Sequence, residues 1–445
     1  MNKREDFPII NQVPGLNPFL PFDTYIPDGE PKVFEGRVFL YGSFDIFNGG
    51  YCSREYHAYS APVGDLTQWT DHGVSFTSDE VPWSDEMLYA PDALFHGGKY
   101  YLYFCLSDGS EGVAESDRPE GPFKNAKRIT LDGEPISGID PSVLEDNGRI
   151  YYTWGQFHLM MGELNDDMCS LKPGSIHSSV ISNDEGCEGF HEGSSLRKIG
   201  DKYCLIYASE YTPEYPNKGG RPTKLDYAVA DSPFGPYERR GTVTDNYGCD
   251  PESWNNHGSV IKIGGEWYVF CHASSNNTRF SRRARAERLE VNEKDCIITQ
   301  AVPSTNGFVK ELLPKHIKSP VNACGFFGGA YVTQTADGRF PAVNLKNDSG
   351  FGFSPVSFEA GEYVLNLEIS ALAEAEIIIS LGDKAAGSAK IKKCESPDAD
   401  EFFSLPIPFK AETGAYALGI KIRSRCSDPV CKINRLSIER AAKGE

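Results

Sequence analysis

The pattern of apolar and polar positions along the chain shows almost no helical periodicity. One motif recurs instead: two short apolar arms flank a tight glycine-containing turn, and the second arm is aromatic. The turn chemistry and the β-branched and aromatic arms predict β-hairpins. The five copies read KVFEGRVFLYGS, ALFHGGKYYLYFC, SVLEDNGRIYYTWG, SLRKIGDKYCLIYAS and SVIKIGGEWYVFCHAS.

The spacing of these hairpins predicts how they assemble. They follow one another at intervals of about 50 to 65 residues, which is the spacing of propeller blades rather than of a simple sandwich. A second repeated segment reads SDRPEGPF and later DSPFGPYE. Such turns are typical of connections at the outer edge of blades. The first part of the chain is therefore predicted to form a five-bladed β-propeller.

The repeat ends near Leu312, and the segment KELLPKHIKSP reads as a polar, proline-bounded linker. The remainder contains short alternating runs such as GEYVLNLEIS and AEIIISLG, which favour a small antiparallel β-sandwich of the jelly-roll kind. The fold class is therefore predicted to be all-β. A propeller domain spans residues 1–314 and a sandwich domain spans residues 321–445.

The composition of the chain restricts the classes of molecule that it could bind. The 445 residues carry a net charge of −19, which argues against nucleic acid or an anionic membrane because both require a basic surface. A neutral sugar would not be repelled. The first residues lack the apolar core of a secretory signal, and no run approaches the roughly 18 apolar residues of a membrane span. The 12 cysteines show no C-x-x-C pair, so free thiols and a cytoplasmic location are expected. Nothing in the sequence indicates the oligomeric state.

Acidic residues precede the recurring hairpin in four of the five blades. Because the inner strand of each blade faces the central axis, residues at its start converge on one pocket. A single acid there would ordinarily be a solvated turn or capping residue, but four at equivalent positions favour a common site. These residues are Asp28 and Glu30, Asp92, Asp140, and Glu188 and Glu192, with His257 in the fifth blade.

Clustered carboxyl groups either bind a hard cation such as calcium or perform acid–base chemistry. Glycoside hydrolysis needs the second arrangement, in which a protonated carboxyl serves the leaving oxygen and a carboxylate activates water or attacks carbon. A sugar pocket also needs aromatic faces. Tyr25, Trp83, Tyr89 and Trp154 flank the acids, although aromatic residues beside strands more often belong to the core.

At this point the chain resembles glycoside hydrolase family 43, whose five-bladed propellers act on arabinose- and xylose-containing glycans. The resemblance covers roughly residues 12–312. It is carried by PDGEPKVFEGRVFLYGSFD, IDPSVLEDNGRIYYTWG and HEGSSLRKIGDKYCLIYAS, in the family's order. It implies that Asp28 is the general base, Glu192 the general acid, and Asp140 the carboxylate that keeps Glu192 protonated. It also implies inversion, with the base and acid carboxyls about 6.5–9.5 Å apart.

One departure affects the base. The family usually has aspartate followed by proline, whereas here Asp28 precedes glycine and the acid–proline pair is Glu30-Pro31. Counting back from the hairpin favours Asp28 over Glu30. Glu188 has no counterpart in the other blades and is interpreted as a loop residue or one behind the site.

The resemblance also suggests residues that bind substrate. His257 is expected in the axial channel, where it would hold water or calcium. Arg283 is chosen as the arginine that reaches the pocket, although Arg282 is adjacent and hard to separate from it. The full substrate-binding set is Tyr25, Trp83, Asp92, Trp154, His257 and Arg283.

The C-terminal sandwich loosely resembles the carbohydrate-binding modules fused to such propellers. It contains no tryptophan, so packing against the propeller is as good an interpretation as sugar binding. No cofactor is implied to be required. The metal sites left open are a calcium ion at the propeller axis and one in the sandwich. Glu359 and Asp428 could serve the latter, but an ordinary solvated surface is the preferred interpretation.

The sequence thus predicts an inverting exo-glycosidase that removes terminal L-arabinofuranosyl or D-xylosyl units from short plant-derived oligosaccharides. One alternative is an endo-arabinanase, which would need an open cleft. Another is a non-catalytic glycan-binding propeller, and a third is a calcium-stabilised interaction scaffold. The presence of all three acids argues against the glycan-binding propeller, and folding that is insensitive to a chelator would argue against the scaffold. The preferred pentose and linkage are not indicated.

Overall fold

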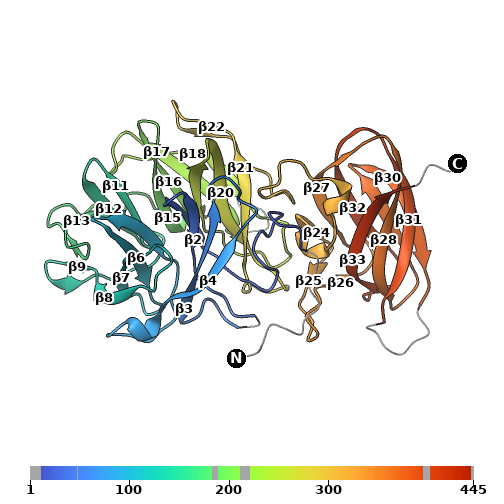
Figure 1. The fold of residues 1–445 in the computed structure, drawn as a ribbon, viewed down its shortest axis with the longest axis horizontal. Helices are drawn as coiled ribbons and strands as arrows, with labels where there is room; N and C mark the ends of the chain where they lie inside the picture. Colours follow the sequence, from blue (N-terminus) through green and yellow to red (C-terminus); the bar gives the residue numbers. More distant parts are fainter. Residues whose placement is uncertain (1–11, 48, 183–188, 211–220, 394–400, 442–445) are drawn as a thin grey trace.

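The computed structural model describes residues 12–47, 49–182, 189–210, 221–393 and 401–441. Its regular structure is almost entirely strand (Figure 1). The 3-10 helices within these described residues are η2 (Ser78–Glu80), η4 (Pro314–His316) and η5 (Pro320–Asn322). None of the helices in the described ranges has the length and apolar character needed to cross a membrane.

Five sheets form the blades of the first part of the molecule, one for each predicted hairpin, and their strands are antiparallel except for the parallel pair β9–β14 in the third sheet (Figure 1). The first sheet contains β1 (Glu30–Phe34), β2 (Arg37–Tyr41), β3 (Glu55–Pro62) and β4 (Thr70–Thr77). The second contains β5 (Asp92–His96), β6 (Lys99–Cys105), β7 (Glu111–Ser116) and β8 (Lys124–Arg128). The predicted hairpins are the pairs β1–β2 and β5–β6.

The third sheet has six strands because two short strands precede its hairpin: β9 (Thr130–Leu131), β10 (Glu134–Pro135), β11 (Ser142–Asp146), β12 (Arg149–Trp154), β13 (Met160–Leu164) and β14 (Ser170–Leu171). The fourth contains β15 (Phe190–Ile199), β16 (Lys202–Ser209), β17 (Lys224–Ala230) and β18 (Glu238–Asp245). The fifth contains β19 (Ser259–Ile263), β20 (Glu266–Ala273) and β21 (Arg283–Leu289), followed by the ribbon β22 (Val291–Asn292) and β23 (Ile297–Ile298).

The five sheets close into a ring. The first strands are neighbours in chain order, β1 with β5, β5 with β11 and β11 with β15, and β19 contacts both β16 and β1. A parallel bridge between Gly29 and Gly258 joins the first blade to the last. The predicted five-bladed propeller is therefore confirmed.

The C-terminal part consists of two packed five-stranded sheets (Figure 1). One has the order β24 (Gly325–Phe327), β27 (Gly350–Phe358), β32 (Gly414–Arg423), β29 (Ala375–Leu381) and β30 (Lys384–Ile391). The other has the order β25 (Tyr331–Val332), β26 (Ala342–Leu345), β33 (Cys431–Arg440), β28 (Gly361–Ala371) and β31 (Phe403–Ala411). Burial alternates residue by residue along β29, as expected for a strand with one face on a core. The predicted sandwich is confirmed.

The two parts of the molecule share packing. Leu16 and Phe22, from the N-terminal segment, belong to the same apolar cluster as the inner faces of the sandwich. The 3-10 helices η4 and η5 lie near residues 314 and 321, between β23 and β24. The domain limits placed at those residues remain a prediction.

Candidate active site

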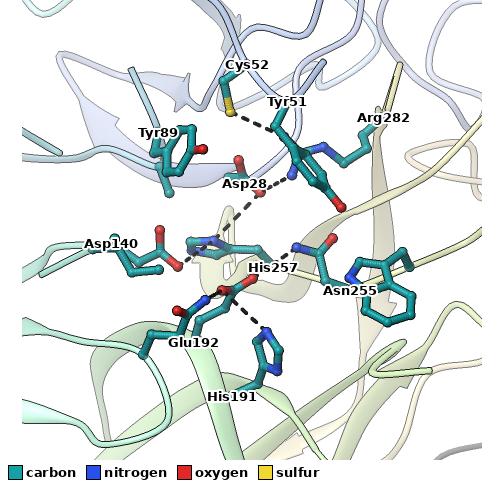
Figure 2. A pocket seen from close by; sticks show the side chains of 14 residues that line it. Asp28, Tyr51, Cys52, Tyr89, Asp140, His191, Glu192, Asn255, His257 and Arg282 are labelled. Carbon is teal, nitrogen blue, oxygen red and sulfur yellow. Dashed lines mark hydrogen bonds and ion pairs between the residues drawn. The ribbon is translucent and has the colours of Figure 1, made fainter. Parts of the chain in front are cut away.

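One pocket gathers the chemistry of the propeller at the starts of its inner strands (Figure 2). Its volume is about 240 Å³, at or below the small end of ligand pockets, which span about 300–1,000 Å³. Its lining residues are Asp28, Tyr51, Cys52, Tyr89, Ala90, Ile139, Asp140, Gln156, His191, Glu192, Trp254, Asn255, His257 and Arg282.

The blades contribute to this pocket from one repeated position. Asp28, Ala90, Asp140 and His257 each lie two residues before the first strand of their blade, and each is followed by glycine or proline. Glu192 takes the corresponding place in the fourth blade and also precedes glycine. All five line the pocket, so the backbone repeat alone brings two aspartates, a glutamate and a histidine together.

A second layer lies behind the pocket. It contains the first residues of β1, β5 and β19, which are Glu30, Asp92 and Ser259, together with Ser195 in the interior of β15. The Ser195 hydroxyl lies within hydrogen-bond distance of Glu30 at 3.2 Å and of Ser259 at 2.7 Å. Glu30 also pairs with Arg197, and Asp92 pairs with Lys32 at 2.7 Å. Glu30, the alternative to Asp28 as base, therefore lies in this buried layer and does not line the pocket.

Asp28 is held on every side. Its backbone adopts a left-handed conformation with φ of 59°, which is uncommon for a residue other than glycine. Oδ2 accepts a hydrogen bond from the Ser43 hydroxyl at 2.5 Å, and Oδ1 accepts one from Nη1 of Arg282 at 3.0 Å. Only 5% of Asp28 is exposed, so its carboxylate is fixed and faces the pocket alone.

Asp140 has the same backbone conformation, with φ of 56°. Its Oδ2 accepts a hydrogen bond from the Gly193 amide at 3.0 Å. Burial raises the pKa of Asp140 to about 7, and the charges of Glu192 and Asp28 act in the same direction. Nδ1 of His257 lies 3.8 Å from Asp140 and 3.7 Å from Asp28. Burial opposes protonation of His257, but these two carboxylates raise its pKa.

Glu192 accepts hydrogen bonds at both carboxyl oxygens. Asn255 Nδ2 donates to Oε1 at 3.0 Å, and Gln156 Nε2 donates to Oε2 at 2.7 Å. Nε2 of His191 lies 3.4 Å from Oε2. Burial raises the pKa of Glu192, but the hydrogen bond and charge of His191, with the two amide donors, outweigh it and lower the pKa to about 2. The role of Asp140 in keeping Glu192 protonated remains a prediction.

A chain of hydrogen bonds connects the two sides of the site through His272. Burial lowers the pKa of His272 to about 3, so the ring is neutral. Its Nδ1 accepts from the Asp28 amide at 3.1 Å, which places the proton on Nε2. Nε2 then donates to Oδ1 of Asn255 at 3.2 Å. This contact orients the Asn255 amide so that its nitrogen faces Glu192.

The arginine at the pocket is Arg282, whereas the sequence favoured Arg283. Arg282 pairs with both oxygens of Asp45 at 2.9 Å and reaches Asp28. Neighbouring side chains on an extended segment point to opposite sides, so Arg283 points away. Its Nε donates to the Phe22 carbonyl at 3.1 Å, and its guanidinium lies 5.2 Å from the ring centre of Tyr25.

Four other residues assigned to substrate binding also lie outside the pocket. Tyr25 is buried and its ring stacks on Phe47. Trp83 stacks on Phe104 in the core between the first two blades. Trp154 is buried in the core of the third blade. Asp92 belongs to the second layer. These placements correct the sequence interpretation. The three aromatic residues lie inside or beside strands and pack against other side chains instead of facing the pocket.

Several pocket residues were not singled out as binding residues. Tyr51 and Tyr89 form aromatic walls, and Trp254 lies beneath the guanidinium of Arg279 at 4.0 Å. Asn255 and Gln156 supply amides. Most of these residues lie in loops outside the hairpin repeat. The sequence signals were that Tyr89 flanks the acids and that Trp254 and Asn255 lie three and two residues before His257. Glu188 lies outside the described residues.

The described residues do not fit a calcium ion at His257. Calcium takes about six to eight oxygen ligands, whereas the carboxylates beside His257 already accept from Arg282 and the Gly193 amide. Within the described ranges, no group of three or more histidine, cysteine, aspartate or glutamate side chains is arranged to hold a metal. In the sandwich, Glu359 pairs with Arg440 at 2.7 Å.

Comparison with known proteins extends this picture. The model of Glycosyl hydrolases family 43 matches residues 39–297. A xylosidase/arabinosidase from Thermoclostridium stercorarium is 32% identical over 422 residues, which cover 85% of each chain. A beta-xylosidase from Xylanibacter ruminicola is 27% identical over 62% of this chain and 96% of its own.

Two solved structures show the same fold. A family 43 beta-xylosidase/alpha-arabinofuranosidase from a compost metagenome, in complex with xylotriose and in a calcium-free form, matches with a TM-score of 0.55 and 27% identity. The match covers 65% of this chain and 99% of that one. A Bacillus subtilis arabinoxylan arabinofuranohydrolase in complex with cellotetraose has a TM-score of 0.55 over 96% of this chain and 97% of its own. At 19% identity it shows the fold alone.

Carboxyl groups that face one another across a pocket are the chemistry that glycoside hydrolysis uses, and the similar proteins place the chain among the glycoside hydrolases. The family match covers more than half of the chain, and a relative more than 30% identical covers most of it. The protein belongs to glycosyl hydrolases family 43.

Proposed function

We propose that the protein is an inverting, exo-acting hydrolase that releases terminal L-arabinofuranosyl or D-xylosyl units from short plant-derived oligosaccharides. The observation that carries this proposal is a single small pocket, about 240 Å³, into which the carboxyl groups of Asp28, Asp140 and Glu192 converge. A pocket of this size suits one sugar residue. The relatives named xylosidase/arabinosidase support a pentose.

In the proposed reaction Asp28 is the general base and Glu192 the general acid. Water attacks the anomeric carbon and gives a proton to Asp28, while Glu192 protonates the leaving oxygen as the glycosidic bond breaks. Inversion requires the two carboxyl groups to stand about 6.5–9.5 Å apart, leaving room for that water. Arg282 and Ser43 hold the base toward the pocket.

Asp140 sets the charge around the acid. It is buried, its pKa is raised to about 7, and it interacts electrostatically with both Glu192 and Asp28. When ionised, it disfavours a second charge on Glu192 and so promotes the protonated acid in the substrate complex. His257, between Asp140 and Asp28, limits the repulsion between them.

The walls of the pocket suit a neutral sugar. Tyr51, Tyr89 and Trp254 offer aromatic faces, and Asn255 and Gln156 offer amides for hydroxyl groups. The side chains supply all the chemistry in this proposal, with no cofactor. Dialysis against a chelator should therefore leave turnover unchanged.

The test compares Asp28→Asn and Glu192→Gln on two kinds of substrate. On xylobiose or an arabino-oligosaccharide, whose leaving groups need protonation, both variants should lose about 100-fold or more in kcat. On dinitrophenyl xyloside or arabinofuranoside, whose leaving group departs unprotonated, Glu192→Gln should retain much of its activity, whereas Asp28→Asn should not. Glu188→Gln is the control and should keep much of the activity.

The stereochemical outcome is a second readout. Proton NMR of the wild-type reaction should show the inverted anomer before mutarotation. Retention of configuration, or near-normal turnover by Asp28→Asn, would exclude the proposed assignment. Sugar binding without release from any glycoside would favour the non-catalytic alternative.

A further inference from the structure

His191 occupies the extra position of a β-bulge in β15. Phe190 pairs with Ser209 and Glu192 pairs with Ala208, so two residues that are consecutive on β16 face two that are separated on β15. In a regular strand His191 and Glu192 would point to opposite faces. The bulge brings both to the same pocket, and Nε2 of His191 lies 3.4 Å from Oε2 of Glu192 (Figure 2).

The other ring nitrogen of His191 is occupied by a second carboxylate. Nδ1 forms a short hydrogen bond with Oε1 of Glu210. Glu210 is fixed in turn, because its backbone amide donates to the Gly189 carbonyl at 2.6 Å. The ring of Phe157 packs edge-on against the imidazole at 5.0 Å. The imidazole is therefore held in one orientation with a carboxylate at each nitrogen.

The three groups differ in their access to solvent. The side chains of His191 and Glu192 are 12% and 14% exposed, whereas that of Glu210 is 31% exposed. The imidazole thus lies between the half-buried carboxylate of Glu210 and the carboxyl group of Glu192 in the pocket.

The charges place the resting proton on His191. Burial lowers the pKa of His191, but the hydrogen bonds and charges of Glu192 and Glu210 outweigh burial and raise it to about 10. The described groups that approach from the third and fifth blades, Phe157 and Asn255, are uncharged. Asp140 and His257 act on Glu192 from those same blades. Arg282, from the fifth blade, is paired with Asp28 and Asp45.

With the proton on His191, Glu192 is ionised, yet a general acid must carry a proton when the glycosidic bond breaks. The donors around Glu192 favour its carboxylate, and the nearest proton is on Nε2 of His191. We propose that His191, oriented by Glu210, is the positioning residue that stores this proton and delivers it to Glu192. The inference rests on the assignment of Glu192 as general acid in the proposed function.

The proton can be followed through a turnover. Substrate expels water from the pocket, which disfavours the separated charges of imidazolium and carboxylate. The Nε2 proton moves to Oε2 of Glu192. The imidazole is then neutral, and its remaining proton stays on Nδ1, which donates a hydrogen bond to Glu210. Glu192 then donates the proton to the leaving oxygen as the bond to carbon breaks. Water bonds to the carbon and loses its proton to Asp28.

The resting state is then restored. Asp28 releases its proton to solvent, and Nε2 of His191 regains one from solvent through the pocket that the imidazole lines. One water molecule is consumed, and no oxidant or co-reactant is needed. Glu210 has the role of fixing the tautomer, because its hydrogen bond keeps Nδ1 protonated and leaves Nε2 as the exchangeable position.

The test uses His191→Gln and Glu210→Gln in the full chain. Glutamine at 191 can still donate a hydrogen bond to Glu192 but cannot give up a proton. We expect kcat on xylobiose to fall by up to about 100-fold, while kcat on dinitrophenyl xyloside and both KM values change little. Glu210→Gln, at a half-buried position, should show the same pattern to a smaller extent.

The pH profile is the readout that a structural role would not move. In the wild type the His191–Glu192 pair holds one proton until the imidazole, whose pKa is raised to about 10, loses it. In His191→Gln the carboxyl group of Glu192 must hold that proton alone. Loss of the imidazolium charge raises the pKa of this carboxyl group, but it still titrates below the pair, so the alkaline limb of kcat on xylobiose should shift down by about one pH unit or more. An equal fall on both substrates, or an unshifted limb in both variants, would overturn the inference. Thermal unfolding checks that each variant is folded.

Glu192→Gln, measured alongside, separates this inference from the proposed function. If Glu192→Gln keeps its turnover of xylobiose, Glu192 is not the acid and both assignments fall. If Glu192→Gln loses turnover while His191→Gln behaves as wild type, only the role of His191 falls.

Discussion

Arg282 and Arg283 are neighbours in the chain, yet only one of them serves the pocket. The planar guanidinium of Arg282 fits Asp45 with two parallel hydrogen bonds and still reaches Asp28. A lysine offers a single point charge and cannot reproduce this fork. Arg283 instead lies over the rings of Tyr25 and Phe340.

We therefore predict opposite outcomes for two similar substitutions. Arg282→Lys should lower kcat at least about tenfold because Asp28 loses its fixed orientation. Arg283→Lys should lower the melting temperature but leave kcat nearly unchanged. Steady-state kinetics and thermal unfolding of both variants check this, and an equal loss of kcat in both would contradict it.

Single residues also show what the sequence could predict. Asp28, Asp140, Glu192 and His257 were identified because they precede recurring hairpins. Asp92 was placed beside them, but the equivalent residue is Ala90, two positions earlier. Aligning the blades on the glycine or proline before each inner strand would have separated the pocket residue from the buried one. Charge alone could not, because the layer behind the pocket contains acids of its own.

At the scale of the element, β15 departs from a regular strand just where the site needs it. Register shifts on either side of Glu192 make room for His191 and Gly193. Gly193 has φ of 66°, and a Cβ added there would stand 2.9 Å from Cγ of His257. Its amide also holds Asp140.

Gly193→Ala should therefore damage activity beyond its effect on stability. The left-handed backbone costs about 1 kcal/mol in an alanine, and the new methyl group displaces His257. We expect kcat to fall at least about tenfold. Gly148→Ala is the matched control, since Gly148 has φ of 71° with open space around it. It should lose similar stability, measured by denaturant unfolding, with kcat unchanged. A normal kcat for Gly193→Ala would refute this account.

The hairpins were predictable because each is encoded locally by a turn and two apolar arms. The bulges were not, since HEGSS reads as an ordinary strand start and the extra residues appear only in the pairing with β16. The walls of the pocket were missed for a related reason. Tyr51 and Trp254 come from connections whose lengths differ between blades, so no repeat marks them, whereas Tyr89 lies directly before Ala90 and was noted beside the acids.

At the scale of the whole molecule, Asn17 joins three distant segments. Its side chain exchanges hydrogen bonds of 2.9 Å with the amide and carbonyl of Ala286 in β21. It also donates to Glu287 at 2.9 Å. Its carbonyl accepts from Asn322 in η5 at 3.0 Å. The N-terminal segment thus completes the edge of the fifth blade and connects it to the sandwich.

Asn17→Ala should lower the free energy of unfolding by about 2–4 kcal/mol, because several buried partners lose their hydrogen bonds. Gln68→Ala, at an exposed position, should change it by less than about 0.5 kcal/mol. Urea unfolding measures both, and a value for Asn17→Ala as small as that of Gln68→Ala would contradict the role given to this segment.

The bridge between Gly29 and Gly258 closes the ring directly beside Asp28 and His257. Asp28 and Arg282, which touch in the pocket, are 254 residues apart in the chain. A nascent chain that has formed four blades already contains Asp28, Asp140 and Glu192. It still lacks Arg282, which orients Asp28, and His257, which lies between the two aspartates. Hydrolytic competence is thus withheld until the last blade has been translated and the two ends of the propeller have met.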